Sequence, residues 1–101
     1  MRMMLTAAIP HEPFNSLVRA GAAGTIMQQI LGQLKPEAAY FVEEHGKRCA
    51  VLFVDIADPS QLPSFAEPFF LKFNADCRFR IAMNAEDLGK ADLAALGQMW
   101  K

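Results

Sequence analysis

The chain has only two cysteines, Cys49 and Cys77, among its 101 residues. Two cysteines so far apart match neither a metal-binding pair nor the framework of a disulfide-rich domain. They fall on the third and fourth strands expected for this chain, with the first strand between these two. This order places the cysteines about 9–10 Å apart across the sheet, beyond the ~7 Å limit for bridging. We therefore expect two reduced thiols that fill space in the packing, as in a cytoplasmic protein.

Net charge is nearly absent, and long apolar runs are missing. Ten Lys and Arg face eleven Asp and Glu, giving a net charge of −1. No basic stripe is present, which argues against nucleic acid as a partner. No run approaches the ~18 apolar residues of a membrane span, and the apolar segment 3–9 ends at Pro10-His11-Glu12 instead of a cleavage site. A soluble cytoplasmic protein is expected.

Apolar side chains are abundant for so short a chain. Hydrophobic residues make up 52% of the sequence, with eight Phe and six Met. A length of 101 residues predicts a single domain, residues 1–101, with only a modest core. This composition predicts either that both faces of a sheet are covered or that part of the surface is an interface with a partner.

The hydrophobic pattern predicts strands and helices in alternation. A strand is expected at 3–9 and a helix from Pro13 to Leu34, with a kink or close packing at Gly21–Gly24. Two strands, 38–44 and 48–56, should form a hairpin at His45-Gly46, since Gly adopts positive φ readily. A fourth strand is expected at 77–83, and a last helix should follow Asn84, a good N-cap residue.

The segment after the third strand carries a helix start signal. Asp58 is a good N-cap, Pro59 suits the first helical position, and Gln61 completes a capping box. The helix should continue to about Phe73, and Pro63 and Pro68 within it predict a distorted or broken helix.

The order β-α-β-β-α-β with an extra C-terminal helix predicts an α+β, ferredoxin-like domain with an antiparallel four-stranded sheet. Helices should cover one face of this sheet. The third strand is apolar in both registers: Cys49, Val51 and Phe53 alternate with Ala50, Leu52 and Val54. A sheet that is apolar on both faces is covered on both, so we expect a second copy of the chain on the open face.

Several short motifs resemble a family of small bacterial proteins with no assigned function. The resemblance covers roughly the C-terminal two-thirds of the chain. It is carried by Tyr40-Phe41, Gly46, Asp55, Asp58-Pro59-Ser60-Gln61, Pro63, Ala66-Glu67-Pro68-Phe69, Asn74-Ala75, Met83 and Glu86-Asp87-Leu88.

The topology also resembles the dimeric α+β barrel group. In that group two ferredoxin-like subunits pair their open sheet faces around a central cavity. Its members include muconolactone isomerases, cofactor-independent monooxygenases, decarboxylating or dehydrating enzymes, and small binding proteins. The resemblance implies a homodimer without a cofactor, and none of the catalytic motifs of those enzymes can be transferred to this chain.

His11 and Tyr40 are the candidates for catalytic roles. His11-Glu12 begins like a zinc-protease motif, but Asn15 stands where the second histidine is required, so no metal site is expected. His11 follows a strand end, where ligand clefts often open, and its alternative is a loop or capping role. Tyr40 could donate a hydrogen bond to a ligand, although such a tyrosine often belongs to an interface.

Arg78 and Arg80 are the candidates for ligand binding. Strand alternation places both on the open face if Phe79 and Ile81 face the helices. A guanidinium there could bind a carboxylate or phosphate with two hydrogen bonds. The alternative is an ion pair between subunits, with Asp55 or Glu43 as the partner.

Three functions are compatible with the sequence. The first is a dimeric domain that binds a small anionic or amphipathic molecule between its two sheets. The second is an enzyme similar to the cofactor-independent isomerases or monooxygenases, and the third is a structural or interaction protein with a filled barrel. Fold alone does not discriminate among them.

Overall fold

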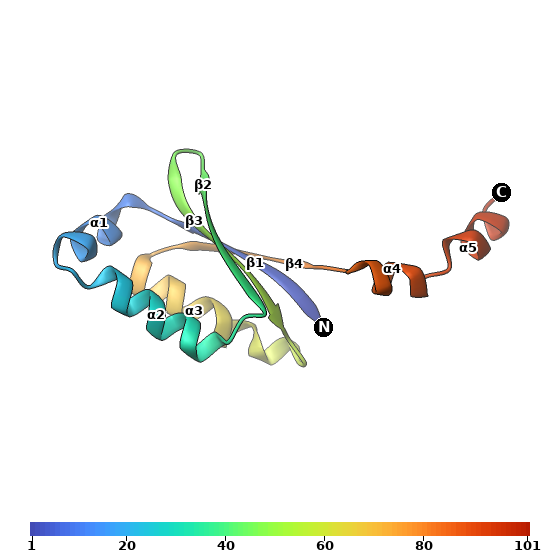
Figure 1. Ribbon diagram of the computed structural model, residues 1–101, viewed down its shortest axis with the longest axis horizontal. Coiled ribbons are helices and arrows are strands. Elements are labelled where there is room, and N and C mark those ends of the chain that lie inside the picture. Colours follow the sequence, from blue (N-terminus) through green and yellow to red (C-terminus); the bar gives the residue numbers. More distant parts are fainter.

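A computed structural model describes all residues, 1–101, and shows an α+β fold (Figure 1). The elements, in chain order, are β1 (Arg2–Ile9), α1 (His11–Arg19), α2 (Ala23–Leu34), β2 (Ala38–Glu44), β3 (Lys47–Asp55), a 3-10 turn η1 (Pro59–Gln61), α3 (Leu62–Phe73), β4 (Asp76–Ile81), α4 (Ala85–Lys90) and α5 (Leu93–Met99).

The four strands form one antiparallel sheet in the order β2-β3-β1-β4. Leu5 in the central strand β1 stands opposite Leu52 on β3 and Phe79 on β4. The antiparallel sheet and its strand order confirm the α+β prediction and are compatible with a ferredoxin-like fold. The predicted hairpin is also present, with positive φ at His45 and Gly46 between β2 and β3.

The core lies between one face of the sheet and the helices α2 and α3 (Figure 1). β1 alternates strictly, with every second side chain, from Met3 to Ile9, buried against the helices. From α3, Phe69 and Phe73 are fully buried and complete this layer. All twelve residues of the core cluster lie between Met3 and Ala75.

The predicted helix from Pro13 to Leu34 is interrupted as expected at its glycines. Gly21 adopts φ +73° and separates α1 from α2, a conformation that costs glycine little. The alternative of close packing fails at Gly24, because a Cβ added there would meet no atom within 4 Å. The range of α1 begins at His11, but Glu12 has an extended backbone (φ −112°, ψ 140°), so the continuous helix starts at Pro13, as expected.

The helix start at Asp58 is confirmed. The Asp58 carboxylate accepts a hydrogen bond from the Ser60 N–H at 2.9 Å, and the Gln61 side chain accepts one from the Asp58 N–H at 3.1 Å. The first turn is a 3-10 turn, and α3 starts at Leu62, so Pro63 falls in the first turn of α3. Only Pro68 lies within the helix, which still runs unbroken to Phe73.

The C-terminal segment differs from the expectation in two respects. β4 ends at Ile81 instead of Met83, and the single last helix is two short helices, α4 and α5. The chain turns between them because Asp92 adopts the left-handed conformation, with φ 52°. Neither helix contributes a buried residue, and both project from the domain, so that the whole chain measures 60 × 28 × 19 Å (Figure 1).

Candidate functional site: the open face of the sheet

One face of the sheet is covered by α2 and α3, and no helix of the chain covers the other (Figure 1). We call this second surface the open face. It carries the side chains that alternate with the core residues: Arg2, Met4, Thr6, Ala8, Ala38, Tyr40, Val42, Glu44, Lys47, Cys49, Val51, Phe53, Asp55, Asp76, Arg78 and Arg80. This confirms that Arg78 and Arg80 lie opposite the helix-facing side chains of Cys77 and Phe79.

The strand register arranges the open face in rows. One row joins Arg80, Met4 and Phe53 across β4, β1 and β3. Met4 and Phe53 are only half-buried, so this row runs from a cation into apolar surface. A ligand with an anionic group and an apolar body would match such a row.

Arg78 is neutralised by a carboxylate of its own chain. Its guanidinium lies 3.0 Å from Glu44 on the opposite edge strand, so the pair spans the open face. The same carboxylate accepts a hydrogen bond from the Cys49 thiol at 3.3 Å. The small side chains of Ala8 and Cys49 lie between the two edge strands and leave room for this crossing.

The carboxylates named from sequence, Asp55 and Glu43, are occupied elsewhere. Asp55 lies 2.8 Å from the Met1 amino group, and Glu43 accepts the Gly46 N–H at 2.6 Å. Sequence reasoning missed Glu44, although strand alternation puts it on the same face as Tyr40 and Val42. The period-two pattern is therefore sufficient to place Glu44 on the open face, although not to pair it with Arg78.

Arg80 makes no ion pair or side-chain hydrogen bond within the chain, and it is exposed. A third arginine on this side of the sheet, Arg2, is held by Glu37 and by Asp87 at 3.2 Å. Arg80 is thus the arginine of the open face whose charge the chain itself leaves unpaired. Of the two predicted ligand-binding candidates, Arg80 is therefore the one without a carboxylate partner in its own chain.

The two candidate catalytic residues are not brought together. Tyr40 lies on the open face and is 61% exposed. His11 is the first residue of α1 and lines a shallow hollow beside the hairpin with Glu43 and Lys47, to which Tyr40 does not contribute. The arrangement offers no acid–base pair formed by these two residues.

Both thiols are free, as predicted, and β1 separates their strands. Cys49 lies on the open face, while Cys77 faces the helices. Burial, with the nearby Glu44 carboxylate, raises the pKa of Cys49 to about 11. Burial, with Asp76 and Glu67, raises the pKa of Cys77 to about 11. Both are therefore protonated at neutral pH, which does not suit a nucleophile.

No group of three or more His, Cys, Asp or Glu side chains is arranged to hold a metal ion. None of the helices combines the length and apolarity that crossing a membrane requires. Comparison with models of known protein families and with curated proteins yields no match to this chain.

Proposed function

We propose that two copies of this chain pair their open faces, as in a dimeric α+β barrel, and bind a small anionic or amphipathic molecule between them. The observation that carries the proposal is the unpaired Arg80 at the border of half-buried apolar surface. On this proposal the domain is ferredoxin-like and acts in the cytoplasm, where its thiols stay reduced.

Pairing is supported by the apolar character of the open face. Met4, Val51 and Phe53 occupy its centre, and Tyr40 and Val42 are exposed on its edge strand. Contiguous apolar surface of this kind is typical of interaction sites. A second copy offers the same surface and covers both at once.

Anion binding is supported by the charges that would be enclosed. Arg78 and Glu44 enter such an interface already paired, whereas Arg80 enters it alone. A guanidinium that is removed from water without a partner is strongly destabilising, so an enclosed Arg80 requires an anion. A carboxylate, sulfonate or phosphate can accept two parallel hydrogen bonds from it, and Met4 and Phe53 would contact the apolar part of the same ligand.

Binding is favoured over catalysis by the position of the candidate residues. His11 lies outside the open face, and the two thiols are protonated. Tyr40 alone faces the proposed cavity, where its hydroxyl can donate a hydrogen bond to a bound ligand. The isomerase or monooxygenase alternative would have to rely on this residue.

The test uses the amphipathic anion 1-anilinonaphthalene-8-sulfonate as a fluorescent probe of the full-length protein. Arg80→Met keeps the length of the side chain and removes its charge, and we expect about tenfold weaker binding or more, since charged hydrogen bonds are worth about 1.5–3 kcal/mol. The matched control is Arg19→Met, because Arg19 lies on α1 away from the open face and the change in net charge is the same.

Equal affinity of the Arg80→Met and Arg19→Met proteins would contradict the proposal. Absence of probe binding by the unchanged dimer would favour the filled barrel instead. Sedimentation of both variants at the same concentrations separates a loss of binding from a loss of assembly.

A further inference from the structure

The segment from Asn84 to Lys101, which contains α4 and α5, forms an arm that projects from the domain and whose helices bury no residue (Figure 1). It nevertheless carries five large exposed apolar side chains: Leu88, Leu93, Leu96, Met99 and Trp100, the last 79% exposed. The core cluster is complete without them, since it ends at Ala75. The apolar side chains of the arm therefore contribute nothing to the core of their own domain.

The arm is nonetheless built with defined helix ends. Asn84 and Asp87 cap α4 reciprocally, at 2.8 and 3.1 Å, and Asp92 accepts the Ala95 N–H at the start of α5 at 3.3 Å. Asp87 also anchors the base of the arm to Arg2 on β1 at 3.2 Å. The arm therefore has defined helices, although its apolar side chains have no packing partner within the chain.

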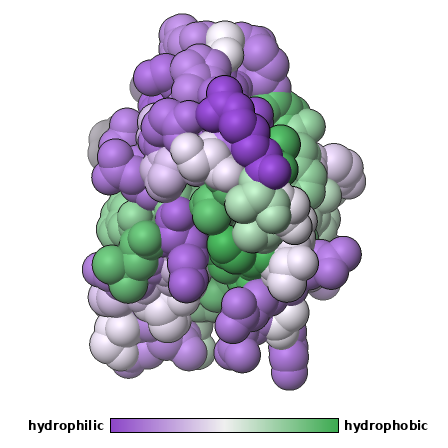
Figure 2. Space-filling view, turned by 90° about the vertical axis from the view of Figure 1, so that its left-hand side faces the viewer, coloured by the Kyte–Doolittle hydropathy of each residue, from purple (hydrophilic) through white to green (hydrophobic).

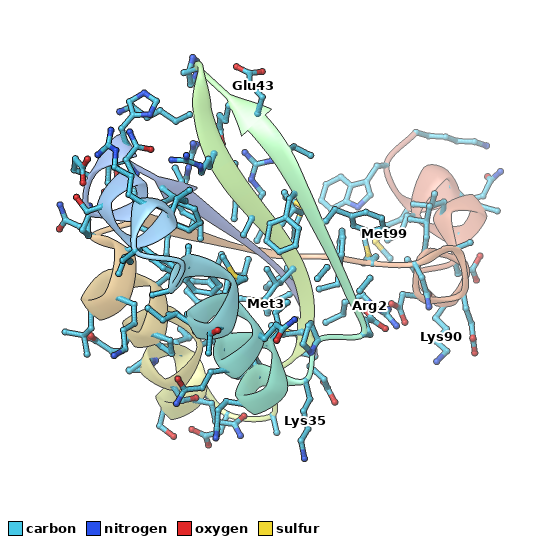
Figure 3. All side chains as sticks on the ribbon, turned by 60° about the vertical axis from the view of Figure 1, so that its left-hand side comes forward. Arg2, Met3, Lys35, Glu43, Lys90 and Met99 are labelled. Carbon is cyan, nitrogen blue, oxygen red and sulfur yellow. The ribbon has the colours of Figure 1, made fainter.

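Figure 3 shows the arm, with Lys90 and Met99 labelled, on the side of the sheet opposite to α2 and α3. This is the side of the open face. A second copy placed on the open face would therefore lie next to the arm of the first.

Packing the arm on the other copy would enlarge the interface between the two open faces. Four strands about 4.8 Å apart, with six to nine residues each at about 3.3 Å per residue, cover a flat area of about 400 to 500 Å². Stable specific interfaces bury about 800 Å² per partner. The arm is the unpacked apolar element of this chain, so packing it on the other copy adds apolar area to that of the paired open faces.

We propose that the arm of each copy is a clasp that packs its apolar side chains on the other copy. The proposal rests on the dimer of the proposed function. A two-fold axis makes the contact reciprocal, so that each copy both gives and receives an arm and the assembly closes as a dimer.

The structure assigns the receiving surface to an apolar hollow at the β2 edge of the sheet. This hollow has a volume of about 390 Å³ and is lined mainly by Ile9, Phe14, Met27 and Phe41. Phe41 points to the helix side of the sheet yet is 58% exposed, because α1 and α2 leave the edge strand uncovered. Figure 2 shows apolar surface exposed among polar side chains at the end of the molecule that carries α1 and the hairpin.

Val42 and Cys49, whose side chains lie on the open face, also border the hollow. An arm that arrives from the open-face side can therefore reach it at the β2 edge. The groove between α2 and α3, lined by Ile26 and Leu71, lies on the far side of the sheet. An arm on the open-face side would have to pass around the whole domain to reach that groove.

The first test compares full-length variants by sedimentation velocity over a dilution series. The Leu96→Ser, Trp100→Ser double variant should dissociate at about tenfold higher concentration or more, because two apolar side chains stay in water. The control is Leu71→Ser, which removes from α3 an apolar side chain as exposed as that of Trp100 and should leave dissociation unchanged. An unchanged dissociation constant in the double variant would overturn the clasp while leaving the dimer intact.

The second test maps the contact by photo-crosslinking. A photoreactive benzoylphenylalanine replaces Trp100 in unlabelled protein, which is mixed and equilibrated with ¹⁵N-labelled protein. We expect crosslinks to labelled peptides that contain Phe14, Met27 or Phe41. Crosslinks confined to the chain that carries the probe would overturn the proposal, and a monomer in every mixture would instead show that the dimer of the proposed function is wrong.

Discussion

Arg78 and Arg80 stand two positions apart on β4 and project to the same face, yet their surroundings differ. Arg78 reaches Glu44 on the far edge strand, whereas Arg80 extends beside Met4 with no carboxylate in contact. The difference depends on which row of the sheet each residue occupies. On the proposed function, a bound anion would depend on Arg80, whereas Arg78 is paired with Glu44 of its own chain.

The cysteines give a residue-scale prediction with a definite sign. The folded protein holds both thiols at a pKa of about 11, against an ordinary value of 9.0, so it binds more protons than the unfolded chain between these values. Stability should therefore be complete below about pH 9 and fall as the pH rises toward 11. The urea midpoint should fall more steeply over this range in the native protein than in a Cys49→Ala, Cys77→Ala variant.

The double variant is the control because Lys and Tyr titrate in the same range in both proteins. Parallel pH profiles for the two proteins would show that the folded state does not resist ionisation of the thiols.

At the scale of the elements, the two capped helices differ in what they stabilise. The helical segment that follows Asp58 carries Phe69 and Phe73 into the core, whereas α4, capped by Asn84, buries nothing. Both caps have a similar geometry, with the side chain accepting from a backbone N–H at 2.9 and 2.8 Å. Their removal should nevertheless have different consequences for the whole domain.

We predict that Asp58→Ala lowers the urea midpoint of global unfolding, since orphan N–H groups at a core helix lose their acceptor. Asn84→Ala should leave the midpoint unchanged when measured at a concentration where the chain is monomeric. Circular dichroism during urea titration measures both. Equal midpoints for native and Asp58→Ala protein would show that other groups satisfy this helix end.

Local chemistry made most elements predictable. Alternation indicated the strands and their faces, the capping box indicated a helix start at Asp58, and Gly21 and Gly24 indicated either a kink or close packing of the helix. The split of the C-terminal helix was not predicted, because Asp92 in a left-handed conformation leaves no strong signal in the sequence. The Glu44–Arg78 pair was missed because it depends on side-chain reach across the two central strands of the sheet.

At the scale of the whole molecule, two apolar surfaces remain uncovered by the chain itself. One is the open face, and the other is the arm that contains α4 and α5. Apolar residues on both surfaces are what the composition predicts for a small domain with an interface. A single two-fold arrangement that covers both surfaces would explain why the chain has more apolar residues than one core needs.

Native mass spectrometry of the full-length protein, purified without denaturant and measured at low micromolar concentration, tests this two-fold arrangement most directly. We predict a species of twice the chain mass of 11.2 kDa, with additional mass from a retained small molecule that is lost in Arg80→Met. A species of 11.2 kDa alone under these conditions would contradict the paired open faces and the cavity between them.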